Sequence, residues 1–388
     1  MSKINIVFFS ANRAEYSLIY PFLKIFSLNK NFNVSLIVAG SHLDKNFGNS
    51  FKEIVNDKVK ILAKIKLPLK TDSLNDVSDY SNLIQKKINI ILKKNKIDLA
   101  FLSSDRFETF AFASSVYLRK IPILHYEGGD ITEGGALDDN IRHAITKLSN
   151  IHLTSNNKSR NNIIKMGEEK WRCINVGYSP IYTIKNTKFD VGKIKNKYSL
   201  NLKKPFILFT LHPIINSKIN TKKDIKEIFN SLEKLYKSGF EVLITYPNFD
   251  PGYLEIIKKI SEIKKKIPQI KIFKNLGRKN YHSLLYYIGK TKNGACMGNS
   301  SSGIKEAVIF NCPTINIGDR QKSRLKPYNV IDVKPIKLKI IKTVEKNLKI
   351  KRLAKNNPYQ ITKNFLVLPR IIQKKFKEIK FTQKKCTL

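Results

Sequence analysis

The sequence predicts an α/β protein made of two Rossmann-like, doubly wound domains that face each other across a cleft. Two observations favour this class. In the N-terminal half, short apolar runs alternate with amphipathic stretches, as in a parallel sheet covered by helices. After a polar segment the same alternation begins again in the C-terminal half. We therefore expect domains at residues 1–180 and 181–357, and a C-terminal helix at 358–380 that packs back on the first domain.

The first half supplies the elements of the first domain. Its expected strands are the apolar runs at 4–9, 34–38, 59–65, 99–102, 121–125, 152–154 and 173–176. Apolar residues at helical spacing predict one buried face with Leu18, Ile19, Phe22, Leu23 and Phe26, and another with Leu83, Ile84, Ile88, Ile91 and Leu92. Two further helices are expected at 107–118 and 137–148.

The crossover between the domains is expected around residues 181–204, where Lys, Asn and Thr dominate before Pro205. Beyond it, strands are expected at 206–211, 241–246, 270–274 and 314–317. Helices are expected at 223–236, 254–264, 282–288 and 303–310. Ligands in doubly wound sheets bind beyond the carboxyl ends of the strands, so the loops after these strands are the places to look for a site.

Composition excludes several classes of protein. The 388 residues are 42% hydrophobic, which is enough for a folded interior. No apolar run approaches the roughly 18 residues of a membrane span, and the first nine residues, MSKINIVFF, are typical of a strand rather than a signal peptide. A cytoplasmic protein without a membrane partner is therefore expected. The four cysteines form no Cys-x-x-Cys pair, and we expect them to be reduced.

The net charge of +42, from 72 Lys and Arg against 30 Asp and Glu, raises the possibility of nucleic-acid binding. The lysines are scattered along the whole chain, however, and no recognition motif accompanies them. A general bias toward Lys, Asn and Ile explains the charge more simply. We therefore expect no specific nucleic-acid partner, and a basic nucleic-acid-binding protein remains an alternative.

Two loops carry groups suited to phosphate. Arg13 follows the first strand at the expected start of a helix, where backbone N–H groups and a guanidinium suit phosphate oxygens, although an Arg there is usually solvated. The turn 298–303 places Ser300, Ser301, Ser302 and Gly303 before a predicted helix that would carry Glu306 one turn inside. The turn favours binding of a pyrophosphate, with the Glu306 carboxylate on the ribose. The alternative is an ordinary capped helix. The chain contains neither a Walker loop nor a Gly-x-Gly-x-x-Gly motif, so no dinucleotide cofactor is indicated.

Carboxylates follow successive predicted strands. They are Asp105, then Glu127 and Asp130, then Asp138 and Asp139 at the start of the next helix. Because carboxyl ends of parallel strands meet at one edge, these groups predict general acid–base chemistry there. The alternatives are compensation of the helix dipole by the last pair and strand-end acids without a role.

Histidines offer a second kind of candidate. His212 directly follows a predicted strand and could either face the cleft or serve the structure. The six histidines show no metal-binding spacing, so no metal site is expected.

Several segments of the chain, taken in order, resemble those of a known protein family. They are Arg13-Ala14-Glu15-Tyr16, Gly40-Ser41-His42-Leu43, Asp105-Arg106-Phe107-Glu108, Glu127-Gly128-Gly129-Asp130, the run 138–147, His212-Pro213, Pro247-Asn248-Phe249-Asp250, the turn 298–303 and the run 315–321. The chain is similar in these to the hydrolysing UDP-N-acetylglucosamine 2-epimerases of sialic-acid and legionaminic-acid pathways. The resemblance implies a GT-B-like fold and a nucleotide-sugar substrate. It also implies elimination to a 2-acetamidoglycal followed by hydration, no metal or redox cofactor, and a homodimer or homotetramer.

The resemblance also assigns roles to individual residues. Acid–base positions of the family fall on Asp105, Glu127 and Asp139, with Asp138 adjacent and Asp130 where some sialic-acid enzymes carry their acid. Positions near the pyrophosphate fall on Arg13, Arg106 and His212. Nucleotide contacts fall on Asn248, Ser301, Ser302, Glu306 and Arg320.

Three segments depart from the family pattern. Ser104 stands where a glycine usually precedes the Asp-Arg pair, and Ile214-Ile215 replaces a polar pair after His-Pro. The segment 132–139 is longer than in some relatives and resembles members that act on diacetylbacillosamine nucleotides, so the sugar and the base, UDP or GDP, stay open. A GT-B glycosyltransferase that uses the same cleft is the alternative enzyme; it would need an acceptor and would leave C2 unchanged.

Overall fold

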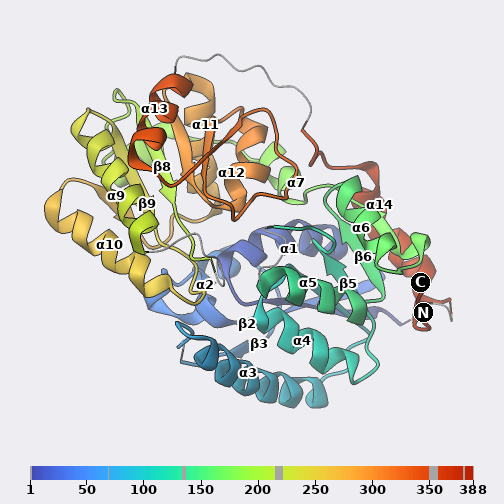
Figure 1. The fold of residues 1–388 in the computed structure, drawn as a ribbon. Coiled ribbons are helices and arrows are strands. Elements are labelled where there is room, and N and C mark those ends of the chain that lie inside the picture. Colours follow the sequence, from blue (N-terminus) through green and yellow to red (C-terminus); the bar gives the residue numbers. More distant parts are fainter. Residues whose placement is uncertain are drawn as a thin grey trace. The chain divides into compact units, whose positions relative to one another are not determined.

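The computed structural model describes residues 2–68, 70–132, 137–214, 222–348, 357–378 and 381–387. The chain divides into two compact units (Figure 1). Unit 1 holds Met1–Ile131, Leu137–Lys185 and Tyr359–Leu388, and unit 2 holds Thr132–Ala136 and Asn186–Pro358. Each unit contains one parallel β-sheet with helices, which confirms the predicted α/β class. No helix in the described ranges is both long and apolar enough to cross a membrane.

Unit 1 is built on a seven-stranded sheet in the order β3-β2-β1-β4-β5-β6-β7. Its strands are β1 (Ile4–Ser10), β2 (Phe32–Ala39), β3 (Ile61–Ile65), β4 (Leu99–Ser103), β5 (Ile123–Tyr126), β6 (Ile151–Thr154) and β7 (Cys173–Asn175). All neighbours pair in parallel, and Phe8 of β1 lies opposite Leu36 of β2 and Phe101 of β4. The strand order reverses between β1 and β4, the position where open α/β sheets bind ligands.

The helices of unit 1 follow the strands as expected for this topology. They are α1 (Arg13–Ser27), α2 (Phe51–Asn56), α3 (Leu74–Lys94), α4 (Phe107–Tyr117), α5 (Leu137–Leu148), α6 (Asn157–Lys165), α7 (Pro180–Lys185) and α14 (Lys363–Phe376), with 3₁₀ turns at Gly40–Leu43, Lys45–Phe47 and Lys170–Arg172. Asn12 caps α1 by accepting hydrogen bonds from the backbone N–H groups of Ala14 and Glu15.

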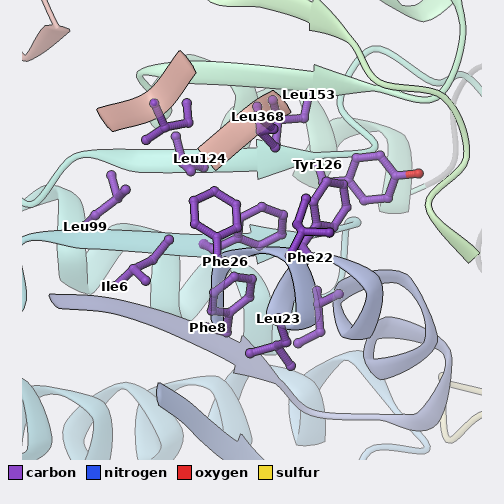
Figure 2. Packing of buried hydrophobic residues seen from close by; sticks show 14 of the residues in the cluster. Ile6, Phe8, Phe22, Leu23, Phe26, Leu99, Leu124, Tyr126, Leu153 and Leu368 are labelled. Atoms are coloured by element: carbon purple, nitrogen blue, oxygen red, sulfur yellow. The ribbon is translucent and has the colours of Figure 1, made fainter. Parts of the chain in front are cut away.

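The core of unit 1 is aromatic. Figure 2 shows Phe22 and Phe26 of α1 lying near Phe8 of β1, in the same buried cluster as Leu368 of α14. Phe8 stacks on Phe101 with ring centroids 4.5 Å apart. Each such ring contributes about 1.5–3 kcal/mol by leaving water. This core holds α1 and α14 against the sheet.

One predicted helical face is wrong in detail. On α3 the buried residues are Val77, Tyr80, Ile84, Ile88 and Leu92, whereas Leu83 is 52% exposed. The buried stripe follows the i, i+4 spacing from Tyr80, and Leu83 lies one position beside it.

Unit 2 is built on a six-stranded parallel sheet in the order β10-β9-β8-β11-β12-β13. Its strands are β8 (Phe206–Thr210), β9 (Glu241–Thr245), β10 (Lys271–Phe273), β11 (Gly294–Gly298), β12 (Thr314–Ile317) and β13 (Val330–Val333). Its helices are α8 (Val191–Tyr198), α9 (Lys222–Lys237), α10 (Tyr253–Lys266), α11 (Arg278–Thr291), α12 (Ser301–Lys305) and α13 (Lys337–Leu348).

The predicted single helix at 303–310 is wrong. The chain forms the short helix α12 and then the 3₁₀ turn η4 (Ala307–Phe310), and Glu306 lies between them with ψ of −43°. Ser300 starts α12 two residues earlier than predicted, because its side chain accepts a hydrogen bond from the backbone N–H of Ser302. Glu306 therefore sits at the end of a short helix rather than inside a long one.

Candidate active site

In unit 1 a buried arginine gathers three of the predicted acidic segments. Arg142, on α5 and only 1% exposed, donates from Nη1 to Asp139 Oδ1 at 2.5 Å and to the backbone carbonyl of Asp130 at 2.7 Å. Its Nη2 forms an ion pair with Asp105 Oδ2 at the end of β4. One guanidinium thus ties α5 to the loops that follow β4 and β5. We call Asp105, Asp139, Arg142 and the Asp130 carbonyl the acid cluster.

Arg142 was not among the residues predicted for the site. The sequence carries a usable signal for it, since Arg142 lies three residues after Asp139 and four after Asp138 on a predicted helix. That spacing places the side chains on one helix face. Asp139 is buried by this arrangement, while Asp138, in the same first turn, is half-buried.

The loops after β4 and β5 both begin with a left-handed residue. Ser104 and Glu127 each have φ of +70°, an uncommon conformation for residues other than glycine. Their N–H groups nevertheless continue the sheet by donating to Tyr126 O and Leu153 O at 3.0 Å. The chain therefore turns sharply just where the acids begin. The conformation of Ser104 also gives the physical reason why a glycine suits this position.

A buried histidine supports this turn. His125 Nε2 lies 2.9 Å from Ser104 O, to which it donates. Burial lowers the pKa of His125 to about 3, so the ring is neutral and serves as a hydrogen-bond donor. Glu127 and Asp130, in the loop after β5, are both buried, at 6% and 5% exposure. Each of these two predicted acids therefore lies at the carboxyl edge of the sheet.

A second buried ionic network lies beside the acid cluster. Arg106, predicted to contact phosphate, donates from Nε to Glu108 Oε2 at 3.0 Å, and both side chains are buried. Glu15 of α1 accepts hydrogen bonds from the backbone N–H of Ala11 at 2.8 Å and from Thr109 Oγ1 at 2.6 Å. Burial, followed by repulsion from Glu108, raises the pKa of Glu15 to about 7. At neutral pH this carboxyl is therefore close to half-protonated.

Arg13 lies at the first position of α1, directly after the Asn12 cap, and is half-buried. Because β1 and β4 are neighbours in the sheet, Arg13 and Asp105 both follow strands that flank the switch point. The structure thus places Arg13 on the same sheet edge as the predicted acids.

In unit 2, Asn299 connects several of the predicted nucleotide residues. Its side chain makes two hydrogen bonds to the backbone of His212, accepting from N at 2.7 Å and donating to O at 2.8 Å. Its backbone carbonyl accepts from Arg320 Nη1 at 3.2 Å and from Gln321 Nε2 at 2.9 Å. Loops after β8, β11 and β12 are therefore joined at one buried residue. Asn299 lies within the predicted turn 298–303, but no role was predicted for it.

The ring of His212 is oriented by the next loop. The backbone N–H of Asn248 donates to His212 Nδ1 at 3.0 Å. Nδ1 is therefore the unprotonated nitrogen, and Nε2 carries the proton of the neutral ring. His212 and Asn248, both predicted for the site, are thereby brought together at the ends of β8 and β9.

The serine turn and Glu306 are bonded to α11. Ser302 Oγ lies 2.6 Å from the hydroxyl of Tyr281, and Glu306 Oε2 lies 3.0 Å from His282 Nε2. Ser301 and Ser302 are half-buried. At Gly303 an added Cβ would lie 2.9 Å from Thr314 Cγ2, so this glycine lets α12 pack on β12.

Some predicted features lie outside the described residues, namely Ile215 and the segment 133–136. The Gly289-Lys290 pair, which resembles the end of a Walker loop, has a packing explanation. A Cβ at Gly289 would lie 1.8 Å from Phe310 O, because α11 lies directly against η4. Within the described ranges, no group of three His, Cys, Asp or Glu side chains could hold a metal ion.

The chain is similar over most of its length to known proteins. A family model described as UDP-N-acetylglucosamine 2-epimerase matches residues 25–364. The chain is 35% identical over 336 residues to a GDP/UDP-N,N′-diacetylbacillosamine 2-epimerase (hydrolyzing) of Campylobacter jejuni, covering 86% of this chain and 85% of that protein. It is 28% identical over 329 residues to the UDP-N,N′-diacetylbacillosamine 2-epimerase (hydrolyzing) of Legionella pneumophila, with 84% of each covered.

Solved structures agree in fold. The crystal structure of UDP-GlcNAc 2-epimerase from Neisseria meningitidis, bound to UDP-GlcNAc, matches with a TM-score of 0.76 at 17% identity. The match covers 96% of this chain and 100% of that one. The predicted GT-B-like architecture, as found in these epimerases, is therefore confirmed.

Proposed function

The chain belongs to the UDP-N-acetylglucosamine 2-epimerase family and is a hydrolysing 2-epimerase of nucleotide-linked acetamido sugars, and from this premise we propose how its residues divide the reaction. The acids of unit 1 move the protons at the sugar, and the polar groups of unit 2 hold the nucleotide. The observation that carries the proposal is the convergence of Asp105, Asp139 and the Asp130 carbonyl on Arg142. This favours the epimerase over the glycosyltransferase alternative, which has no use for such acids.

The first step is an elimination. A carboxylate from Asp105, Glu127, Asp130, Asp138 or Asp139 removes the proton from C2 as the bond from C1 to the nucleoside diphosphate breaks, giving a 2-acetamidoglycal. The C2 proton is weakly acidic, so its base must be held in place before the substrate arrives. Arg142 supplies that order, because its fork fixes two carboxylates at once.

The second step is the addition of water. Water adds to C1 and gives its proton to a carboxylate, while a carboxylic acid of the same group returns a proton to C2 from the opposite face. The products are the free C2-epimeric sugar and the nucleoside diphosphate. Glu127 is our first choice for one of these two roles, since it is buried and directly follows β5 at a strained turn.

The nucleotide is assigned to unit 2. Donors for the diphosphate and the nucleobase come from the N–H at Nε2 of His212, from Asn248 and from Arg320. Donors fixed in this way stabilise the negative charge that develops on the departing nucleoside diphosphate. The serine turn 300–303 and Glu306 are assigned to the phosphates and the ribose. In unit 1, Arg13 and Arg106 are assigned to the pyrophosphate, and Arg106 would share its guanidinium with Glu108.

For the substrate we propose a UDP-linked or GDP-linked N-acetylated hexosamine, either N-acetylglucosamine or N,N′-diacetylbacillosamine. The names of the Campylobacter and Legionella relatives support the second sugar. A product of either kind would feed a nonulosonic-acid pathway, sialic or legionaminic. We also expect a cytoplasmic homodimer or homotetramer that needs no added cofactor.

A substrate panel in deuterium oxide tests this function. We expect release of free sugar and nucleoside diphosphate, with deuterium at C2 of the product seen by NMR. Asp105→Asn and Glu127→Gln should abolish turnover and keep UDP binding, whereas Ser302→Ala with Glu306→Ala should weaken UDP binding. No turnover of any panel member, or a product with its C2 proton retained, would refute the proposal.

A further inference from the structure

One side chain next to the nucleotide residues of unit 2 has no role in the reaction outlined above. His282 lies on α11, is buried at 4% exposure, and has Nε2 3.0 Å from Glu306 Oε2. A carboxylate oxygen can only accept, so Nε2 carries the hydrogen and donates it. Glu306 is itself buried at 7% exposure, where a hydrogen bond to a charged acceptor is worth more than one at the surface.

The position of His282 is set by packing. Its ring lies 5.9 Å from that of Phe310 and 6.5 Å from that of Phe189, and the two phenylalanine rings are 5.2 Å apart in an edge-to-face arrangement. Gly289, two turns further along α11, lets that helix lie directly against the carbonyl of Phe310. The imidazole is therefore held in one orientation, with its Nε2 directed at Glu306.

The backbone around Glu306 gives this contact its importance. Glu306 lies between α12 and η4, so the carboxylate is carried by a junction rather than by the middle of a helix. The orientation of the carboxylate is set by the groups that it contacts, and His282 is one of them. The preceding residue of α11, Tyr281, makes the corresponding contact to Ser302 at 2.6 Å.

We propose that His282 is a positioning residue for the nucleotide: its Nε2 holds the carboxylate of Glu306 in the orientation that receives the ribose hydroxyls. This inference rests on the proposed function, in which Glu306 contacts the ribose. It adds a residue outside the serine turn on which nucleotide affinity depends. The effect belongs to binding rather than to proton transfer, so it should appear in KM and in the affinity for UDP.

The test compares two ligands on three variants. UDP and 2′,3′-dideoxy-UDP are titrated by calorimetry into wild type, His282→Leu, His282→Gln and His282→Asn. His282→Leu should weaken UDP about tenfold, as expected for one lost hydrogen bond to a charged group. The same change should weaken dideoxy-UDP less than threefold, because that ligand has no hydroxyls for Glu306 to hold. Turnover should show a raised KM with kcat within threefold of wild type.

The polar variants serve as matched controls. The amide nitrogen of Gln reaches the place of Nε2, whereas that of Asn reaches only the place of Nδ1, so Gln should restore UDP affinity and Asn should not. Both keep a polar side chain, so they remain informative if the leucine variant fails to fold. Equal losses for the two ligands, or equal affinities of Gln and Asn variants, would overturn the inference. Wild type that binds no UDP would instead contradict the proposed function.

Discussion

Replacing Arg142 with lysine tests the acid cluster most directly, because it keeps the charge and removes the fork. The guanidinium uses two nitrogens on three partners, namely Asp105, Asp139 and the Asp130 carbonyl. A lysine ends in one nitrogen on a differently shaped stem, so it cannot reproduce both ion pairs. At least one of the two carboxylates loses a charge-assisted hydrogen bond, a loss of about 1.5–3 kcal/mol.

If that loss falls on the transition state, kcat/KM should decrease about 10- to 150-fold at 1.36 kcal/mol per decade. The assay is the release of free sugar followed by NMR, with UDP affinity measured in parallel. UDP affinity should stay within twofold, since Arg142 is not among the residues assigned to the nucleotide. Arg119→Lys, at an exposed arginine that follows α4, is the control and should match wild type. Activity of Arg142→Lys within threefold of wild type, or a parallel loss of UDP affinity, would show that the fork does not order the acids.

Three further changes probe the scaffold. The raised pKa of Glu15 means that the folded state holds its proton up to about pH 7, whereas the unfolded chain releases it near pH 4.5. This group's contribution to stability is therefore complete below pH 4.5 and is lost as pH rises toward 7. Glu15→Gln should reduce the loss of unfolding free energy between pH 5 and pH 7.5 by about 2 kcal/mol, measured by urea unfolding. Gly289→Ala should lower the free energy of unfolding by about 1–3 kcal/mol, because the new Cβ meets Phe310 O, and exposed Lys279→Ala on the same helix should not. Ser104→Gly should raise the free energy of unfolding by about 1 kcal/mol, because glycine adopts the positive φ without strain. Ser104→Ala is the control that keeps the strain. Equal melting temperatures of the Gly and Ala variants would count against this explanation.

Most of the fold could be predicted from the periodicity of the sequence. The helix at 137–148 has the predicted bounds, and the buried strands β1, β4 and β12 are within one residue of theirs. Strand β11 was missed because its sequence, GACMG, is short, begins and ends with glycine, and contains no β-branched residue. Pairing on both sides, with β8 and β12, stabilises it in spite of that composition, and no local pattern reports such neighbours.

The candidate acids could be predicted from the order of strands along the sequence, whereas the side chains that they contact could not. The acids at strand ends were predicted from the parallel sheet alone, and the structure brings Asp105 and Asp139 onto one arginine. The raised pKa of Glu15 depends on burial and on Glu108, which belongs to α4, far along the chain from α1. Contacts between such distant parts of the chain have no period that a sequence could display.

The distribution of positive charge explains how a chain of net charge +42 can still recognise one kind of ligand. In the part of the chain that the structure describes, the buried Lys and Arg side chains are Arg106, Arg142, Arg172 and Lys305. The other described cations are at least partly exposed, where water and salt screen them beyond about 10 Å. A screened, scattered charge attracts any anion and selects none. We therefore expect selectivity to come from groups with fixed partners, such as Arg320 on the backbone carbonyl of Asn299. Arg142, which holds Asp105 and Asp139 together, is the buried cation whose geometry bears on the proton transfers.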